Sequence, residues 1–170
     1  MWFPSASRFS RPGRCHVGHF PWTTHFKLPI PRQFVHVFPV VIGVSSPGLF
    51  TYDGNRAVVQ NDDFSLNAST NPARSGSTVV AYLTGQGETN PSVRDGFVPP
   101  EGVLAVPRSA VSATIGGRSA EILFAGLTPQ FVGLLQVNLK VPSLPSGDYP
   151  LVVTIGGVAS NSALIAVSGN

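Results

Sequence analysis

The chain has 170 residues, enough for one domain with an additional arm, and only 11% of them are charged. Apolar residues make up 42%, which can fill a core, while 18 Gly and 16 Pro favour short strands and tight turns over long helices. The net charge of +3 does not indicate nucleic-acid binding, because residues 1–45 carry five basic and no acidic side chains, whereas residues 46–170 carry six basic and eight acidic ones. A single Cys excludes an internal disulfide, and no apolar run is long enough to predict a membrane span.

Residues 1–34 are predicted to form an irregular arm. Pro recurs between residues 4 and 31, which breaks any helix, and Pro and Arg stand where a signal peptide needs an apolar core. The arm is interpreted as a disordered segment. Alternatively, it is truncated, or it is translated from a wrong start or in a shifted frame. A basic aromatic arm for nucleic acid or a membrane surface is the less favoured alternative. Cys15, His16 and His19 supply three metal donors at most, so we expect no metal site.

From residue 35 onward, the chain predicts about eight strands separated by turn signals. The first four are expected at residues 35–44, 56–60, 64–67 and 77–84. Pro39 favours an edge position for the first strand, and the run Asn61-Asp62-Asp63 forms the turn between the second and the third. The fourth strand is apolar on both faces, which predicts a central position. The same Asn-Asp-Asp turn offers oxygen ligands for Ca²⁺, but its spacing lacks the alternating acidic pattern, and a plain turn is favoured.

A long loop rich in Gly and Pro follows at residues 85–108. Loops of this length inside a compact domain are uncommon and often make a domain's contacts. Glu88, Asp95 and Phe97 lie on this loop, and Phe131 lies in a later turn that would present it outward. These four residues are the candidate contacts with a ligand or partner.

The stretch from Val111 to Pro142 predicts three antiparallel strands. Its first two runs alternate apolar and polar residues on either side of Gly116-Gly117, a pair that allows the positive φ angles of a two-residue hairpin. In the third run, Leu135, Val137, Leu139 and Val141 share one face, and Gln136, Asn138 and Lys140 share the other. Such alternation is typical of a half-buried strand.

The last two strands are expected at residues 149–155 and 158–168, joined by Gly156-Gly157. The whole pattern predicts an all-β, immunoglobulin-like β-sandwich of about seven to eight strands over residues 35–170, preceded by the irregular arm.

Several short motifs resemble, in the same order, the uncharacterised carboxy-terminal domain that ends many large secreted proteins of acidobacteria. They are Pro47-Gly48-Leu49-Phe50, Asn71-Pro72-Ala73, Tyr82-Leu83-Thr84-Gly85-Gln86-Gly87, Asp95-Gly96, Ile115-Gly116-Gly117, Phe124-Ala125-Gly126-Leu127-Thr128-Pro129, Gly133-Leu134-Leu135-Gln136-Val137-Asn138, Val141-Pro142 and Ser160-Asn161. The resemblance covers residues 43–170, and the later part also looks like an IPT/TIG immunoglobulin-like module. It implies an extracellular or cell-surface setting, upstream domains in a larger protein, and an accessory role without catalysis.

Independent of this resemblance, the residues argue against hydrolytic chemistry. Beyond His36 and Cys15 the chain has no His and no Cys, so a nucleophile in the module has no imidazole base in the module. The adjacent Asp62 and Asp63 diverge in a turn, and the loop acids Glu88, Asp95 and Glu101 are expected to be solvated rather than paired for glycoside hydrolysis. We therefore expect no enzyme activity and no cofactor.

The sequence favours a non-catalytic extracellular or cell-surface module with a structural, adhesive or protein-interaction role. The alternative is a carbohydrate-binding module that uses the loop at residues 85–108 and an aromatic side chain to hold a cell-surface polysaccharide. No nucleic acid and no membrane span are expected.

Overall fold

The computed structural model describes residues 23–27 and 37–169, and these residues form strands, turns and loops without a helix. The chain divides into two compact units, Met1–Gly43 and Val44–Asn170. The described part of the first unit is an antiparallel pair of β1 (Thr23–Lys27) and β2 (Val37–Val41), in which Thr23 stands opposite Val41.

The strand β1 lies inside the segment that we expected to be irregular. Its sequence TTHFK is rich in β-branched and aromatic residues, which favour an extended backbone, and Pro21 and Pro29 flank it rather than interrupt it. The strand predicted at 35–44 is present as β2, with Pro39 inside a two-stranded sheet, where each strand is an edge. Both strands belong to the first unit, so the larger unit begins at Val44 rather than at residue 35.

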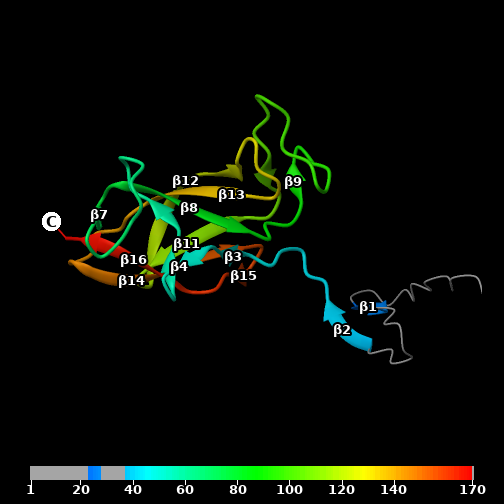
Figure 1. The fold of residues 1–170 in the computed structure, drawn as a ribbon, viewed down its shortest axis with the longest axis horizontal. Helices are drawn as coiled ribbons and strands as arrows, with labels where there is room; N and C mark the ends of the chain where they lie inside the picture. The colour runs from blue at the N-terminus through cyan, green and yellow to red at the C-terminus, as the bar shows by residue number, and fades with distance from the viewer. Residues whose placement is uncertain (1–22, 28–36, 170) are drawn as a thin grey trace, which may run out of the picture. The chain divides into compact units, whose positions relative to one another are not determined.

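The second unit consists of short strands in one large sheet, with β9 and β10 forming a separate pair. Its strands are β3 (Gly48–Leu49), β4 (Thr51–Tyr52), β5 (Arg56–Ala57), β6 (Val59–Gln60), β7 (Ala73–Arg74), β8 (Thr78–Thr84), β9 (Thr89–Asn90), β10 (Val106–Pro107), β11 (Val111–Ile115), β12 (Arg118–Leu127), β13 (Leu135–Lys140), β14 (Gly147–Ile155), β15 (Val158–Ala159) and β16 (Ala163–Ser168). Figure 1 shows their arrangement. The all-β prediction is confirmed.

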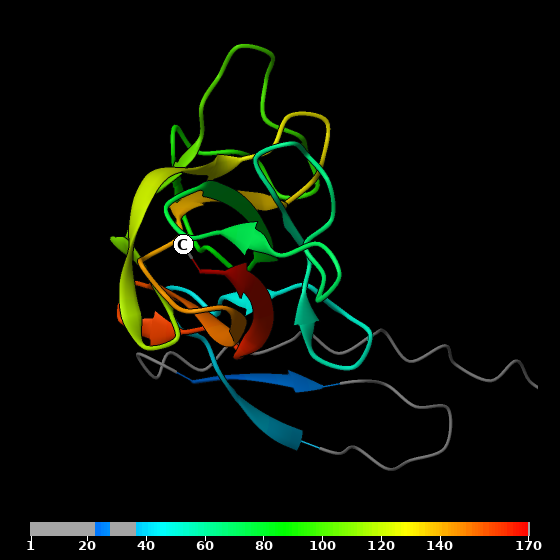
Figure 2. The same ribbon diagram turned by 90° about the vertical axis from the view of Figure 1, so that its left-hand side faces the viewer.

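Two segments pass from one part of the sheet to another and give the unit its sandwich-like or barrel-like form (Figure 2). Strand β12 pairs with β11 through its first residues and with β13 through its later ones, and the β12–β13 ladder contains a register shift between Ile122 and Phe124. Such a bulge bends the strand and increases its twist. The segment Arg56–Gln60, predicted as one strand, is interrupted at Val58: β5 pairs with β16, and β6 pairs with β8.

The predicted hairpin at Gly116-Gly117 is confirmed. Strands β11 and β12 are antiparallel, with Ile115 opposite Arg118, and the two glycines have φ angles of 59° and 75°. Two consecutive positive φ angles match the right-handed twist of the flanking strands.

The core lies between the inward faces of these strands. On β8 and β13 every second side chain is fully buried, and the two strands are neighbours with Leu135 opposite Leu83. The fully buried side chains of large volume are Leu83, Ile115, Leu135, Leu139, Leu151, Ile155, Ile165, Val59, Val79, Val137, Val141 and Val153. The alternation read from residues 135–141 is therefore correct, and β8 is an internal strand, as predicted.

The predicted return strand at residues 64–67 is reduced to a single residue pair. It forms only an isolated bridge between Gln60 and Leu66, and Phe64 has a φ of 64° and is 77% exposed. The backbone N–H groups of Asn61 and Asn67 donate to the carbonyls of Ser65 and Val59, so the segment does return beside β6. The ladder ends there because the chain turns again at once, with Ala68 and Asn71 bonded to each other through their backbones.

Candidate functional site

The predicted long loop at residues 85–108 is tied down at its base. Strands β9 and β10 pair there, and the backbone N–H of Arg108 donates to the carbonyl of Glu88 at 2.9 Å. Further along, Leu127 of β12 donates its N–H to the carbonyl of Ala105 at 2.8 Å. The two ends of the loop are therefore paired with each other, Ala105 joins the loop to β12, and the middle of the loop projects from the module near β9 (Figure 1).

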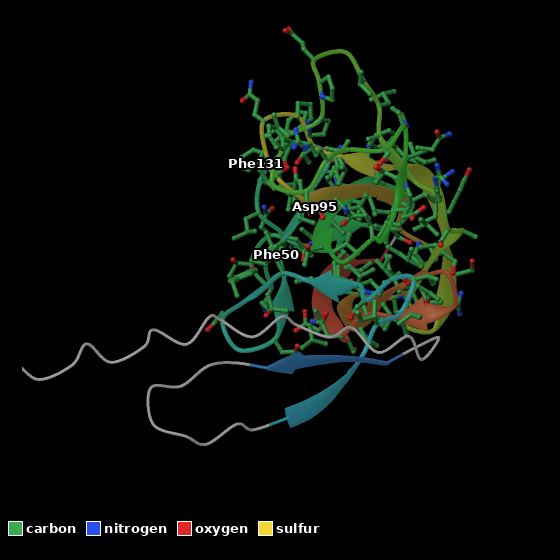
Figure 3. The ribbon with its side chains drawn as sticks, turned by 90° about the vertical axis from the view of Figure 1, so that its right-hand side faces the viewer. Phe50, Asp95 and Phe131 are labelled. Carbon is green, nitrogen blue, oxygen red and sulfur yellow. The ribbon has the colours of Figure 1, made fainter. Side chains whose placement is uncertain are left out.

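A pocket of about 580 Å³ lies between this loop and the turn that joins β12 to β13. It brings together three of the four residues predicted from the sequence, Glu88, Asp95 and Phe97. The fourth, Phe131, does not line the pocket, but the next residue, Val132, does. Figure 3 labels Phe131 and Asp95. The loop and the later turn therefore both border this pocket.

Five large apolar side chains of the loop and the later turn are exposed. Phe97 and Phe131 are 57% and 58% exposed, and Val98, Leu104 and Val132 are exposed as well. We call these five residues the loop-end surface. Exposed apolar side chains that gather in one place are typical of contact sites, whereas scattered ones need no explanation.

The charged side chains of the loop are solvated. Glu88 forms an ion pair with Arg108 at 3.4 Å, and both side chains are largely exposed, so the pair contributes little to stability. The guanidinium of Arg94 lies 5.1 Å from the centre of the Phe97 ring, a cation–π distance. One face of Phe97 is therefore covered by its own loop.

The remaining sequence candidates have structural roles or lie outside the described residues. Tyr149, an aromatic residue at the start of the strand expected at 149–155, packs its ring at the Gly116 turn and donates its hydroxyl to the carbonyl of Pro145. Asn61, a possible Ca²⁺ ligand, is buried, and its amide bonds with Asn67 and with the carbonyl of Asn71.

Cys15, His16 and His19, weighed as metal donors, lie outside the described residues. Within residues 23–27 and 37–169, no group of three or more His, Cys, Asp or Glu side chains lies close enough to hold a metal. The same residues include no helix that could span a membrane.

Sequence reasoning missed a second polar cluster, on the outer face of the sheet. It consists of side chains from β6, β8, β12 and β13: Gln60, Tyr82, Phe124, Gln136 and Asn138. The alternation in residues 135–141 placed Gln136 and Asn138 on one face, but it gave no indication of which strands would flank them.

No family model matches the sequence, and no curated protein is significantly similar to it. The resemblance to the carboxy-terminal domain of secreted proteins therefore stays a prediction.

Proposed function

We propose that the chain is a non-catalytic module that binds a protein partner through its loop-end surface. The observation that carries this proposal is the exposure of Phe97, which lines the pocket, and of Phe131, which precedes the pocket residue Val132, on two segments that are distant in the sequence. Aromatic side chains are enriched at protein interfaces because they remove much apolar area from water.

Loop contact is a better mechanism than pairing of a partner strand with the sheet edge. The strands at the two ends of the sheet order, β3 and β4, are two residues long each. A partner strand gains affinity from a row of free backbone groups, and two-residue strands present few of them. The loop-end surface, in contrast, presents large side chains.

The proposed setting is extracellular or at the cell surface, as the tail of a larger protein, in a structural or adhesive role. It rests on the resemblance to the carboxy-terminal and IPT/TIG domains. The proposed lack of catalysis rests on the sequence, since residues 44–169 contain no His and no Cys.

Site-specific photocrosslinking tests the proposed contact. A photoreactive phenylalanine analogue replaces Phe131 in the full chain, in cells that produce the protein. Because Phe131 lies on the loop-end surface, we expect one discrete crosslinked protein adduct. The matched control carries the analogue at Ser119, an exposed position on β12 beside the Gly116-Gly117 turn, and should give no such adduct.

Equal adducts at both positions, or none at Phe131, would count against the loop-end surface as the contact site. Fractionation with an antibody against residues 44–169 tests the setting. A product near 17.9 kDa inside the cell would contradict a secreted or surface protein, whereas a larger one outside would support it.

The alternative function, carbohydrate binding in the loop pocket, has one observation in its favour: Phe97 lines a pocket that also holds polar side chains. The position of Arg94 over the Phe97 ring weakens this alternative, because one of the two ring faces that could stack on a sugar is already covered. A titration with oligosaccharides that depends on Phe97 would favour this alternative over the protein contact.

A further inference from the structure

The outer face of the sheet carries a polar cluster that is separate from the loop-end surface. On β8 and β13, side chains alternate between full burial and partial exposure, so Tyr82, Gln136 and Asn138 point away from the core. Figure 1 shows β8, β13 and β12 side by side, in agreement with their hydrogen-bonded ladders. The central strand of the three is β13.

The register of the ladders places one aromatic residue on each side of this central strand. Gln136 stands opposite Tyr82 on β8 and opposite Gly126 on β12, while Asn138 stands opposite Phe124 on β12. Residues directly opposite on one face are near neighbours. The two amides therefore lie in a row between Tyr82 and Phe124.

Both aromatic rings have defined positions. A Cβ added at Gly126 would lie 2.5 Å from Cζ of Phe124, so the Phe124 ring covers the glycine and lies beside Gln136. On the other side, the hydroxyl of Tyr82 donates to Oε1 of Gln60 at 2.7 Å. The absence of a side chain at Gly126 thus lets Phe124 lie along the sheet surface.

A hydrogen bond between the side-chain amides of Gln136 and Asn138 fixes both groups but uses only some of their donors and acceptors. Nε2 of Gln136 donates to Oδ1 of Asn138 at 2.8 Å, which fixes both side chains on the face. A primary amide has two donor hydrogens and an oxygen with two lone pairs. This bond therefore leaves the oxygen of Gln136 and the amino group of Asn138 to bond with a ligand.

The chemistry of the face matches an uncharged ligand that has both apolar and hydroxyl-bearing surfaces. The cluster and the neighbouring Val80 contain no charged side chain; Lys140 lies at the end of the face and is 4.0 Å from Glu121. A pyranose ring has apolar C–H faces for stacking and equatorial hydroxyls for amides. Binding sites of this kind combine aromatic surface with a few placed polar groups.

We propose that the outer face formed by β8, β13 and β12 binds a neutral oligosaccharide, with Tyr82 and Phe124 contacting the sugar rings and Gln136 and Asn138 bonding the hydroxyls. This site differs from the loop pocket and from the loop-end surface, so it neither depends on the proposed protein contact nor replaces it.

Titration calorimetry on the full chain tests this inference, with cellohexaose, xylohexaose, mannohexaose and maltohexaose as probes. We expect at least one of them to bind with a Kd below about 1 mM. Gln136→Glu keeps the shape of the side chain but removes its donor and adds charge, so it should weaken that binding at least about tenfold. Asn138→Ala is the second variant, and NMR amide dispersion reports that each variant is folded.

The matched control is Gln86→Glu, which makes the same change in the loop pocket and should leave the affinity unchanged. Failure of all four sugars to bind would overturn the inference, as would binding that survives both face variants. Binding lost in Gln86→Glu but retained in Gln136→Glu would assign the saccharide to the loop pocket instead. Photocrosslinking at Phe131 should be unaffected by Gln136→Glu, so the two proposals can fail independently.

Discussion

Asn67 bonds to both polar groups of the Ala166 backbone, although 99 residues separate the two in the chain. Its Oδ1 accepts the N–H of Ala166 at 2.8 Å, and its Nδ2 donates to the carbonyl of Ala166 at 2.9 Å. Asn67 is buried, and the same amino group also donates to Oδ1 of Asn61 at 3.0 Å. The side chain thus replaces a neighbouring strand beside β16.

Replacing Asn67 should therefore destabilise the module strongly. Asn67→Ala leaves the N–H and the carbonyl of Ala166 without partners in a buried place, and each unsatisfied group costs about 1–3 kcal/mol. We expect a loss of about 2–4 kcal/mol in the free energy of unfolding, measured by urea denaturation. The control, Asn55→Ala at an exposed turn, should change it by less than about 0.5 kcal/mol. Similar losses in both variants would contradict this role for Asn67.

Replacing Phe64 should have the opposite effect and increase the free energy of unfolding. Its φ of 64° lies in the left-handed region, which is costly for an aromatic residue, and its side chain is 77% exposed, so little burial is lost on replacement. Phe64→Asn should raise the free energy of unfolding by about 1 kcal/mol, measured by thermal unfolding. Leu66→Asn, exposed and close by, should bring no gain. An unchanged or lower stability in Phe64→Asn would mean that the ring makes contacts that offset the strain.

Two glycines with the same φ angle allow the cost of backbone strain to be measured apart from the cost of a steric clash. Gly85 and Gly96 both have a φ of 79°, but a Cβ at Gly85 would lie 1.9 Å from the carbonyl oxygen of Ser46, whereas a Cβ at Gly96 meets open space. Gly96→Ala should cost about 1 kcal/mol, the ordinary penalty for Ala in this conformation.

Gly85→Ala should cost at least about 2 kcal/mol more in urea denaturation, because backbone cannot yield as a flexible side chain does. It should also break the bond in which the Ser46 N–H donates to the Gly85 carbonyl at 2.8 Å, and hydrogen exchange at Ser46 reports this. Equal costs for the two substitutions would show that the segment at Ser46 moves aside freely.

The sequence was most informative where one local rule decides the structure. Gly116-Gly117 predicted a hairpin because the turn needs positive φ angles, and the alternation around Val137 predicted a strand with one buried face. The sequence was least informative where the structure of a segment depends on strands that are distant from it in the chain. The interruption at Val58 depends on two different strands, β16 and β8, that compete for one segment, and no local pattern records such competition.

The same contrast between local patterns and long-range pairing applies to the candidate surfaces. Glu88, Asp95 and Phe97 share one loop, so their proximity could be expected, whereas Val132 joins them because the end of β12, which leads into its turn, is bonded to the loop at Ala105. On the outer face, the position of Gln136 between two aromatic residues depends on the order β8-β13-β12. That order is fixed by long-range pairing, which composition and periodicity do not encode.

Asp63 gives a prediction that depends on pH. The Ser65 hydroxyl, and then the Ser65 backbone N–H, donate to Oδ1 of Asp63 and lower the pKa of this carboxyl below its ordinary value. A group whose pKa is lower in the folded state stabilises the fold fully above its unfolded pKa and loses this contribution as the pH falls through the folded pKa. Asp63 is fully exposed, so the contribution is screened by solvent.

Ser65→Ala removes the larger of the two causes and should move the pKa of Asp63 up toward its ordinary value, as measured by NMR titration of the carboxyl carbon. The stability difference between the two proteins should be largest at neutral pH and shrink below the ordinary carboxyl pKa, where both carboxyls become protonated. A pKa of Asp63 that stays low in Ser65→Ala would show that the backbone N–H alone stabilises the carboxylate.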